Sequence, residues 1–130
     1  MPTLQLKIAP PQSADRLASL ARRLTDLSTQ ILGKRREVTA VIVEELWPGR
    51  WFIGGRQVTD ATALLEIRVT QGTNSADEKE AFVEAAFEEL SQQLGPLHEA
   101  SYVVVQEVAA TDWGYGGRTQ AERKMKTPVL

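Results

Sequence analysis

The chain repeats one stretch, which reads VTAVIVEELWPGRWFIGGR at residues 38–56 and ASYVVVQEVAATDWGYGGR at residues 100–118. In both copies a valine-rich run leads into Trp-x-x-Gly-Gly-Arg, so that Trp51 corresponds to Trp113 at an offset of 62 residues. Self-similarity at a fixed offset is the signature of a duplicated structural unit. The fold is therefore predicted to be a pseudo-symmetric pair.

The first copy is predicted to contain a strand, a helix and a second strand, followed by a glycine-ended hairpin. Residues 3–8 alternate apolar and polar side chains, which is typical of a strand. Ser13 then offers a helix N-cap and Gly33 a helix stop. Between them, apolar residues recur at helical spacing: Leu17, Leu20, Ala21, Leu24, Leu27 and Ile31.

The second copy carries the same signals. Residues 65–69 alternate, Gly72 turns the chain, and Ser75 with Glu78 forms a capping-box pattern. An apolar stripe is then expected along the helix, made of Val83, Ala86, Phe87, Leu90 and Leu94.

Two such units predict an α+β fold with a four-stranded mixed sheet and two helices on one face. The crossover inside each half is expected to be right-handed, with its two strands parallel. Residues 40–43 and 102–105 are apolar at consecutive positions, which is typical of strands buried on both faces. Self-association would cover the second face; the alternative is burial inside a monomer. The tail after Arg118 either packs as a strand or frays.

The amino-acid composition argues against several classes of protein. The 130 residues carry a net charge of −2 with mixed signs, so no nucleic-acid-binding surface is expected. No apolar run is long enough for a bilayer, and no secretion signal is apparent, so we expect no membrane partner. The chain has no cysteine and one histidine, which argues against a transition-metal site and is compatible with a cytoplasmic location.

In order along the chain, Met1-Pro2, the alternating strand, the helix, the valine-rich strand and the Trp-x-x-Gly-Gly hairpin resemble the 4-oxalocrotonate tautomerase family over residues 2–118. The tandem copy resembles the fused, double-length members. The resemblance implies one domain with the tautomerase/MIF-like fold across residues 1–130, with repeats at about 2–56 and 63–118 and a tail at 119–130. It also implies a homotrimer of such chains.

In this family the amino-terminal proline does the chemistry, and Pro2 fits that position. If Met1 is removed, Pro2 is a secondary amine that can take a proton from a substrate and return it elsewhere. The second copy has Leu64 or Ala63 at that point in mid-chain, so one site per chain is expected. The alternative is that Pro2 only begins an edge strand.

The resemblance also implies a substrate-binding set. Trp51, or its duplicate Trp113, would form an apolar wall beside the amine. The family's two arginines are replaced, one by Gln12 and the other by Ala40, whose duplicate Tyr102 could donate its hydroxyl or simply lie in the core. Cations that could substitute, or that are merely solvated, are Arg50, Arg56, Arg68, Arg118 and the run Lys34-Arg35-Arg36.

These residues favour an isomerase that needs no cofactor and acts on a small unsaturated or enolisable carboxylic acid. A second interpretation keeps Pro2 but changes the reaction to hydration, dehalogenation or decarboxylation, with Asp112 as the carboxylate that positions water. A third is a catalytically inactive trimeric interaction protein. Glu45 recurs as Glu107, which indicates a structural role.

Overall fold

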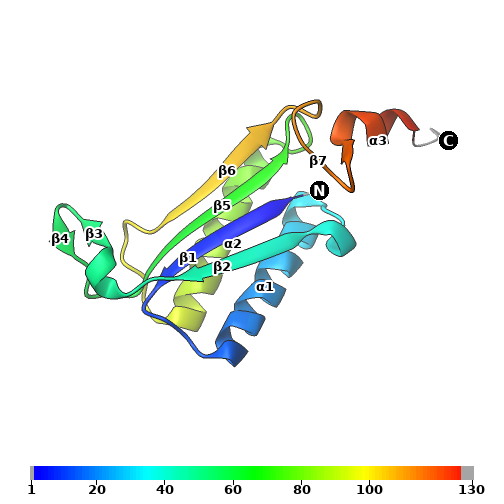
Figure 1. The fold of residues 1–130 in the computed structure, drawn as a ribbon. Helices are drawn as coiled ribbons and strands as arrows, with labels where there is room; N and C mark the ends of the chain where they lie inside the picture. The colour runs from blue at the N-terminus through cyan, green and yellow to red at the C-terminus, as the bar shows by residue number, and fades with distance from the viewer. Residues whose placement is uncertain (1, 127–130) are drawn as a thin grey trace.

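The computed structural model describes residues 2–126 and contains a four-stranded sheet in the order β2-β1-β5-β6. Two long helices lie side by side against one face of this sheet (Figure 1). The predicted α+β fold, with a mixed sheet and both helices on one face, is confirmed. The bounds are β1 Thr3–Ala9, α1 Ala14–Leu32, β2 Ala40–Glu45, β5 Thr62–Thr70, α2 Ala76–Leu94 and β6 Tyr102–Val108.

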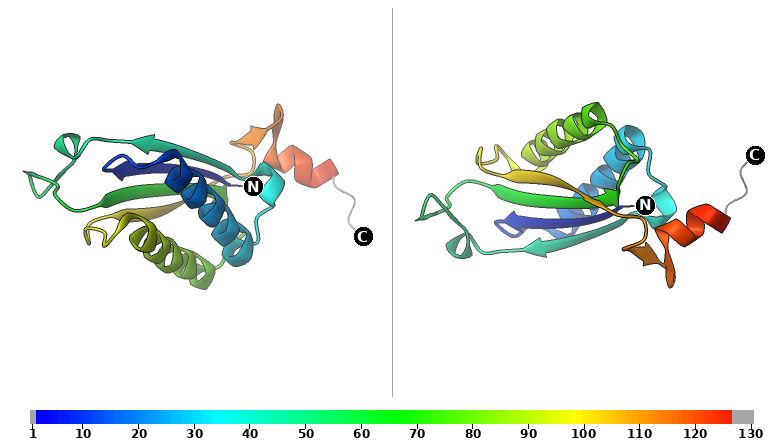
Figure 2. Two further views of the ribbon diagram at one scale, coloured as in Figure 1. Left: turned by 90° about the horizontal axis from the view of Figure 1, so that it is seen from below. Right: turned by 90° about the horizontal axis from the view of Figure 1, so that it is seen from above.

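Strand pairing decides which ends of the four strands lie side by side. β1 runs parallel to β2, and β5 runs parallel to β6, as predicted for each half. The halves join through antiparallel pairing of β1 with β5, so β1 and β2 begin where β5 and β6 finish (Figure 2). Because β1 lies between β2 and β5, the alternative that Pro2 begins an edge strand is wrong.

The helices begin and end where the sequence predicts. The Ser13 hydroxyl accepts a hydrogen bond from the Arg16 N–H at 3.2 Å, and Ser75 with Glu78 forms a complete capping box. α1 stops at Gly33, whose φ of 68° lies in the left-handed region that side chains with a Cβ rarely adopt.

The core lies between the sheet and the helices, and one part of the predicted stripe on α2 is wrong. Ala86 and Leu90 are fully buried as expected. Phe82 is also fully buried, whereas Val83 is 37% exposed and Phe87 only partly buried. Positions 82, 86 and 90 are spaced by four residues and so share a face. The helix is therefore rotated so that Phe82, rather than Val83, points to the sheet.

The other face of the sheet is uncovered. Val41, Val43, Val103 and Val105 pack against the core, while the residues between them point away from the helices. Ile42 is 60% exposed and Tyr102 64% exposed. The expectation of burial inside a monomer is therefore wrong for these strands. Exposed apolar side chains that lie on one uncovered face are typical of an interaction site.

A short hairpin follows each half, as predicted, and the two hairpins lie at opposite ends of the sheet (Figure 1). One short 3-10 turn, η1, precedes β2, and a second, η2, leads into the first hairpin. The bounds are η1 Arg36–Val38, η2 Pro48–Arg50, β3 Phe52–Ile53 and β4 Arg56–Gln57 for the first half, and β7 Gly114–Tyr115 and β8 Arg118–Thr119 for the second.

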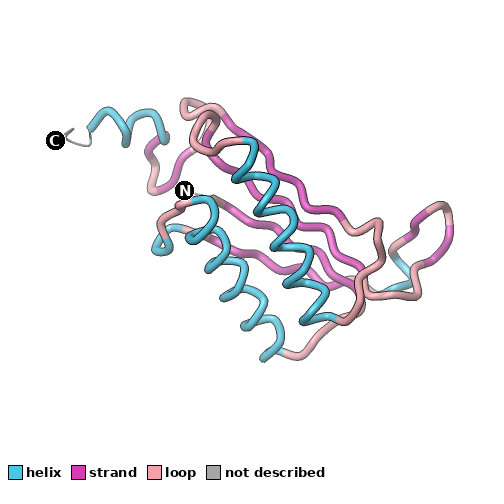
Figure 3. The backbone as a smooth tube through the Cα atoms, turned by 180° about the vertical axis from the view of Figure 1, so that it is seen from behind, coloured by secondary structure: helices cyan, strands magenta, loops and turns pink. Residues whose placement is uncertain are grey.

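The tail neither extends the sheet nor frays where it is described. It forms α3, Gln120–Lys126, which continues directly from β8 (Figure 3). Helix formation is favoured here because the Thr119 hydroxyl accepts from the Glu122 N–H at 3.0 Å, in the manner of an N-cap. Met1 and the last residues of the tail, 127–130, lie outside the described residues.

Within residues 2–126, no helix combines the length and the apolar character that crossing a bilayer requires. The same part of the chain contains no group of three or more histidine, cysteine or acidic side chains arranged to hold a metal ion.

Glu45 and Glu107 occupy equivalent places at the ends of their strands. The Glu45 carboxylate accepts from the Gln12 N–H, and the Glu107 carboxylate accepts from the Gly72 N–H at 3.1 Å. Each therefore ties the loop after the neighbouring strand to its own strand. This is the structural role that their repetition indicates.

We expect the free energy of unfolding to fall as the pH drops below about 4. Hydrogen bonding from Lys79 holds the pKa of Glu107 below its usual value, and bonds from the Ser75 N–H and Asn74 do so for Glu78. A carboxyl group with a lowered folded-state pKa stabilises the fold above its unfolded pKa and loses that contribution as the pH falls. Urea titrations from pH 2 to 7 measure the slope. Glu78→Gln should flatten it, while Glu80→Gln, exposed on the same helix, should not; equal slopes would contradict the assignment.

Candidate functional site

Pro2 is buried at the start of β1, beside a groove of about 340 Å³. Its carbonyl oxygen accepts from the Ala40 N–H at 3.4 Å, which ties it to the start of β2. We call this the amino-terminal groove; it is lined by Thr3, Glu37, Val38, Thr39, Ala40, Gly114 and Tyr115. Both halves of the chain therefore form it: the strand starts come from the first half and the hairpin from the second.

Antiparallel pairing of β1 and β5 brings the second hairpin to Pro2. The Trp113 indole N–H donates to the Thr70 hydroxyl at 3.2 Å, which anchors the hairpin at the end of β5. Gly114 allows β7 to approach β8 closely, because a Cβ there would lie 1.8 Å from the Arg118 carbonyl oxygen. Trp113 thus shares this end of the sheet with Pro2.

Lys34 is a buried cation at the same end. It follows the C-terminus of α1, is 7% exposed, and donates from Nζ to the Thr73 hydroxyl at 2.9 Å. Burial lowers the pKa of Lys34, and the charge of Glu78 partly offsets this shift. A surface location is therefore wrong for Lys34, although Arg35 and Arg36 beside it are exposed.

Arg68 is the arginine that strand register places beside the amino-terminal groove. It is the cross-strand partner of Thr3, a lining residue of that groove. Arg68 follows buried Ile67 and precedes buried Val69, so its side chain points to the uncovered face of the sheet. Directly opposed residues on antiparallel strands have Cβ atoms about 4.5–5.5 Å apart.

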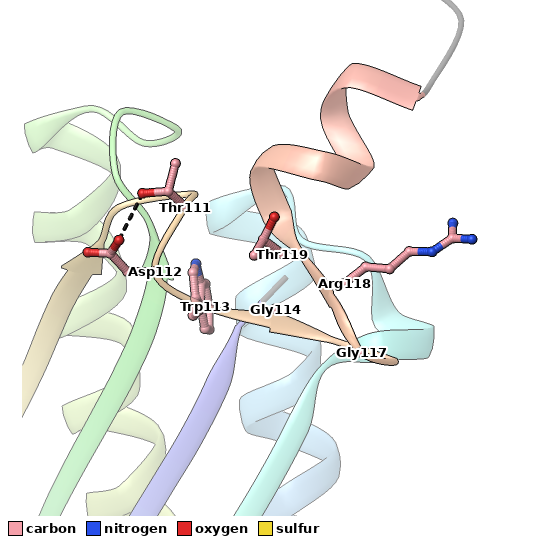
Figure 4. Close-up of a pocket in the computed structure, with 7 residues that line it drawn as sticks. All are labelled: Thr111, Asp112, Trp113, Gly114, Gly117, Arg118 and Thr119. Atoms are coloured by element: carbon pink, nitrogen blue, oxygen red, sulfur yellow. Dashed lines mark hydrogen bonds between the residues drawn. The ribbon is translucent and has the colours of Figure 1, made fainter.

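A smaller pocket of about 260 Å³ adjoins the second hairpin. Trp113 forms one side of it, and Asp112 points toward Thr111, whose hydroxyl donates to the Asp112 carboxylate at 2.8 Å (Figure 4). Arg118 extends away from both Asp112 and Trp113. Asp112 therefore lies next to the amino-terminal groove but does not line it.

A second groove, of about 310 Å³, lies at the opposite end of the sheet. We call it the internal groove; its lining is Trp51, Phe52, Ile53, Gly54, Leu64, Ala100 and Tyr102. It repeats the amino-terminal groove at the 62-residue offset, with Leu64 in place of Pro2 and Tyr102 in place of Ala40. Duplication has thus produced two matched grooves, and the position that Pro2 occupies at one is Leu64 at the other.

The remaining predicted site residues lie away from Pro2 within one chain. Trp51 and Tyr102 meet each other in the internal groove. Gln12 follows the far end of β1, where its side-chain amide donates to the Pro10 carbonyl at 3.0 Å. Arg50 is exposed in the turn before the first hairpin. Within one chain Trp113 therefore lies at the same end of the sheet as Pro2, in the pocket next to the amino-terminal groove, whereas Trp51, Tyr102, Gln12 and Arg50 do not.

Sequence reasoning did not single out Tyr115 and Glu37, which line the amino-terminal groove. Tyr115 replaces Ile53 of the first copy, so a comparison of the two hairpins at the 62-residue offset offers a signal. Glu37 stands in a charged turn with no motif around it, and nothing in the local pattern distinguishes it from a solvated residue.

Comparisons with known proteins match both halves of the chain to one family. The family model described as Tautomerase enzyme matches twice, at residues 2–61 and 64–123. A comparison with curated protein sequences finds no match.

Solved structures with the same fold include fused 4-OT proteins. One, a wild-type fused 4-OT described as an asymmetric trimer, is 22% identical, has a TM-score of 0.84 and covers 96% of this chain and 99% of its own. A native fused 4-OT is 24% identical, with a TM-score of 0.84 and coverage of 92% and 97%. A member of the cis-3-chloroacrylic acid dehalogenase family is 20% identical, with a TM-score of 0.81 and coverage of 97% and 92%. At these identities the likeness establishes the fold.

Proposed function

Because the chain belongs to the tautomerase family over residues 2–61 and 64–123, we propose that Pro2, once Met1 is removed, is the general base of a keto–enol tautomerase. The observation that carries the proposal is the burial of Pro2 beside the amino-terminal groove. The equivalent groove of the second half has Leu64 at this position, which has no amine to offer. One site per chain follows.

The surroundings of Pro2 favour a neutral amine near pH 7. Burial disfavours the charged form of an amine and lowers its pKa from the ordinary value near 8. A neutral amine can accept a proton, and its conjugate acid can give that proton back.

The proposed reaction moves one proton. The Pro2 nitrogen takes the proton from the enol hydroxyl as the oxygen forms a carbonyl double bond. The electron pair of the former C=C bond then takes the proton back from Pro2 at carbon. No electrons leave the substrate, so the reaction needs no redox partner and no cofactor.

Charge around the groove favours a substrate with one carboxylate. Among the described residues that line the amino-terminal groove, Glu37 is acidic and none is lysine or arginine. Arg68 beside Thr3 is the cation that we assign to the substrate carboxylate, in a contact of the kind that arginine makes well. The expected substrate class is a small enolisable or unsaturated monocarboxylic acid.

A second candidate function is hydration of an unsaturated acid. The observation that favours it is the position of Glu37 on the groove, where a carboxylate can orient a water molecule toward the substrate. Asp112 is less well placed for that role, because it lines the adjacent pocket. Loss of a hydration rate in Glu37→Gln, with the ketonisation rate unchanged, would identify this activity.

We also propose that three chains assemble through the uncovered sheet face in the cytoplasm. Ile42, Tyr102 and Val104 expose apolar side chains on this face. The first hairpin, with Phe52 60% exposed, is the segment best placed to reach a neighbouring chain. In such a trimer Trp51, Tyr102, Arg50 and Gln12 would contribute to substrate binding across the interface.

The proposal is tested by the ketonisation rate of phenylenolpyruvate. Protein shown by intact mass to lack Met1 is compared with a variant carrying an inserted lysine after Met1, which keeps the Pro2 nitrogen in an amide. We expect the first to exceed the buffer rate by about 10²-fold or more and the second to match buffer. The rate should rise with pH as the amine loses its proton. Buffer-level rates for both proteins would contradict the tautomerase function and leave either the hydration reaction or the non-enzymatic trimer.

A further inference from the structure

The C-terminal helix α3 is attached to the hairpin that forms the wall of the amino-terminal groove. The Ala121 N–H donates to the Ala110 carbonyl at 2.9 Å, and the Gln120 N–H donates to the Trp113 carbonyl at 2.9 Å. These bonds place the first turn of α3 beside the start of the second hairpin, as the ribbon shows (Figure 1). The side chain of Arg123 therefore reaches the hairpin tip.

Arg123 holds Tyr115 in two ways. Its Nη2 and Nε donate to the Tyr115 carbonyl at 2.8 and 3.3 Å. Its guanidinium carbon also lies 3.8 Å from the centre of the Tyr115 ring, a cation–π contact. Backbone and ring are fixed by one side chain, and Tyr115 lines the amino-terminal groove.

This attachment exists at one groove and not at the other. The 62-residue offset places Ala61 at the position of Arg123 and Ile53 at the position of Tyr115. Ala61 lies at the entry to β5 and has no side chain that can reach a hairpin tip. The chain has therefore added the arginine contact only where Pro2 is present.

We propose that Arg123 is a positioning residue of the amino-terminal groove, which sets the place of Tyr115 as the wall against which the substrate packs. The kinetic part of this assignment rests on the proposed function. Arg123 itself does not line the groove, so it acts through Tyr115. Substrate binding should depend on it more than the proton transfer at Pro2 does.

Two adjacent glycines supply a matched pair of variants. A Cβ on Gly116 would lie 2.6 Å from Arg123 Nη2, whereas a Cβ on Gly117 would have nothing within 4 Å. Both have positive φ values, 62° and 78°, so alanine strains the backbone similarly at either position. Gly116→Ala therefore requires the Arg123 guanidinium to shift, whereas Gly117→Ala does not.

The kinetic experiment uses the full chain lacking Met1 and phenylenolpyruvate as the probe. We expect Arg123→Ala to raise KM about tenfold with kcat within about twofold, and Arg123→Lys to recover part of the loss because it keeps the cation. Lys124→Ala, exposed on the same helix, should match the wild type. Gly116→Ala should raise KM more than Gly117→Ala, and this difference should vanish in the Arg123→Ala background. An unchanged KM in Arg123→Ala, or an equal fall of kcat and kcat/KM, would overturn the proposal.

Hydrogen exchange separates failure of this proposal from failure of the proposed function. Backbone amides of residues 114–119 should exchange about tenfold faster in Arg123→Ala than in Lys124→Ala, because local opening of the hairpin becomes easier. Unchanged exchange overturns the role of Arg123 whatever the enzyme does. Faster exchange in a protein whose wild type has no ketonisation activity would instead remove the proposed tautomerase function and keep the attachment of Tyr115.

Discussion

Replacing Pro2 with alanine is expected to lower kcat/KM for the ketonisation of phenylenolpyruvate by about 10²-fold or more, the usual contribution of a positioned general base. Alanine leaves a primary amine but removes the ring that fills the buried site beside Thr3 and Ala40. The amine then has more orientations and better access to water, so its pKa moves back toward the ordinary value. Intact mass must show that Met1 is absent from both proteins.

Pro11→Ala is the control for this experiment. Pro11 is exposed at the far end of β1, so its replacement removes a proline without touching either groove. Its kcat/KM should equal that of the wild type. Full activity in Pro2→Ala would contradict the assignment of the base, whereas equal losses in both variants would indicate damage to the fold.

Replacing Phe82 with alanine is expected to have the largest effect on stability, about 3–5 kcal/mol in the free energy of unfolding. The ring is fully buried between α2 and the sheet, and its removal leaves a cavity that the surrounding strands cannot fill. Urea unfolding followed by tryptophan fluorescence measures the change. All samples need the same chain concentration, because association stabilises the folded state by mass action.

Val83→Ala is the matched comparison on the same helix. Val83 is 37% exposed, and alanine has the higher helix propensity, so the change should stay below about 1 kcal/mol. Similar losses for Phe82→Ala and Val83→Ala would mean that a partner chain covers the outer side of α2. The pair therefore tests the rotation of the helix, for which the sequence pattern had predicted Val83 rather than Phe82 in the core.

The duplicated halves form two equivalent grooves that carry different residues. Each groove combines the strand starts of one half with the hairpin of the other, so neither half can form one alone. The internal groove carries Leu64 and Tyr102 where the amino-terminal groove has Pro2 and Ala40. Under the proposed function, only the amino-terminal groove has an amine beside it, and the internal groove can serve the reaction only through contacts with a neighbouring chain.

The sequence by itself determined the local elements and the fold class. Alternation, helical spacing and the caps at Ser13 and Ser75 are set by contacts within a few residues, so each can be read from a short window. The repeated Trp-x-x-Gly-Gly likewise predicted both hairpins. The 62-residue repeat then fixed the pseudo-symmetric architecture, because two copies of one unit must bury their apolar faces together.

Only the tertiary structure decided which parts of the two copies meet. Antiparallel pairing of β1 with β5 places the second hairpin, with Trp113 and Tyr115, next to Pro2, and sends Trp51 to the far groove. The burial of Phe82 in place of the predicted Val83 on α2 was decided in the same way. Local spacing is identical for either arrangement, since strand order and helix rotation depend on contacts between residues far apart in the chain.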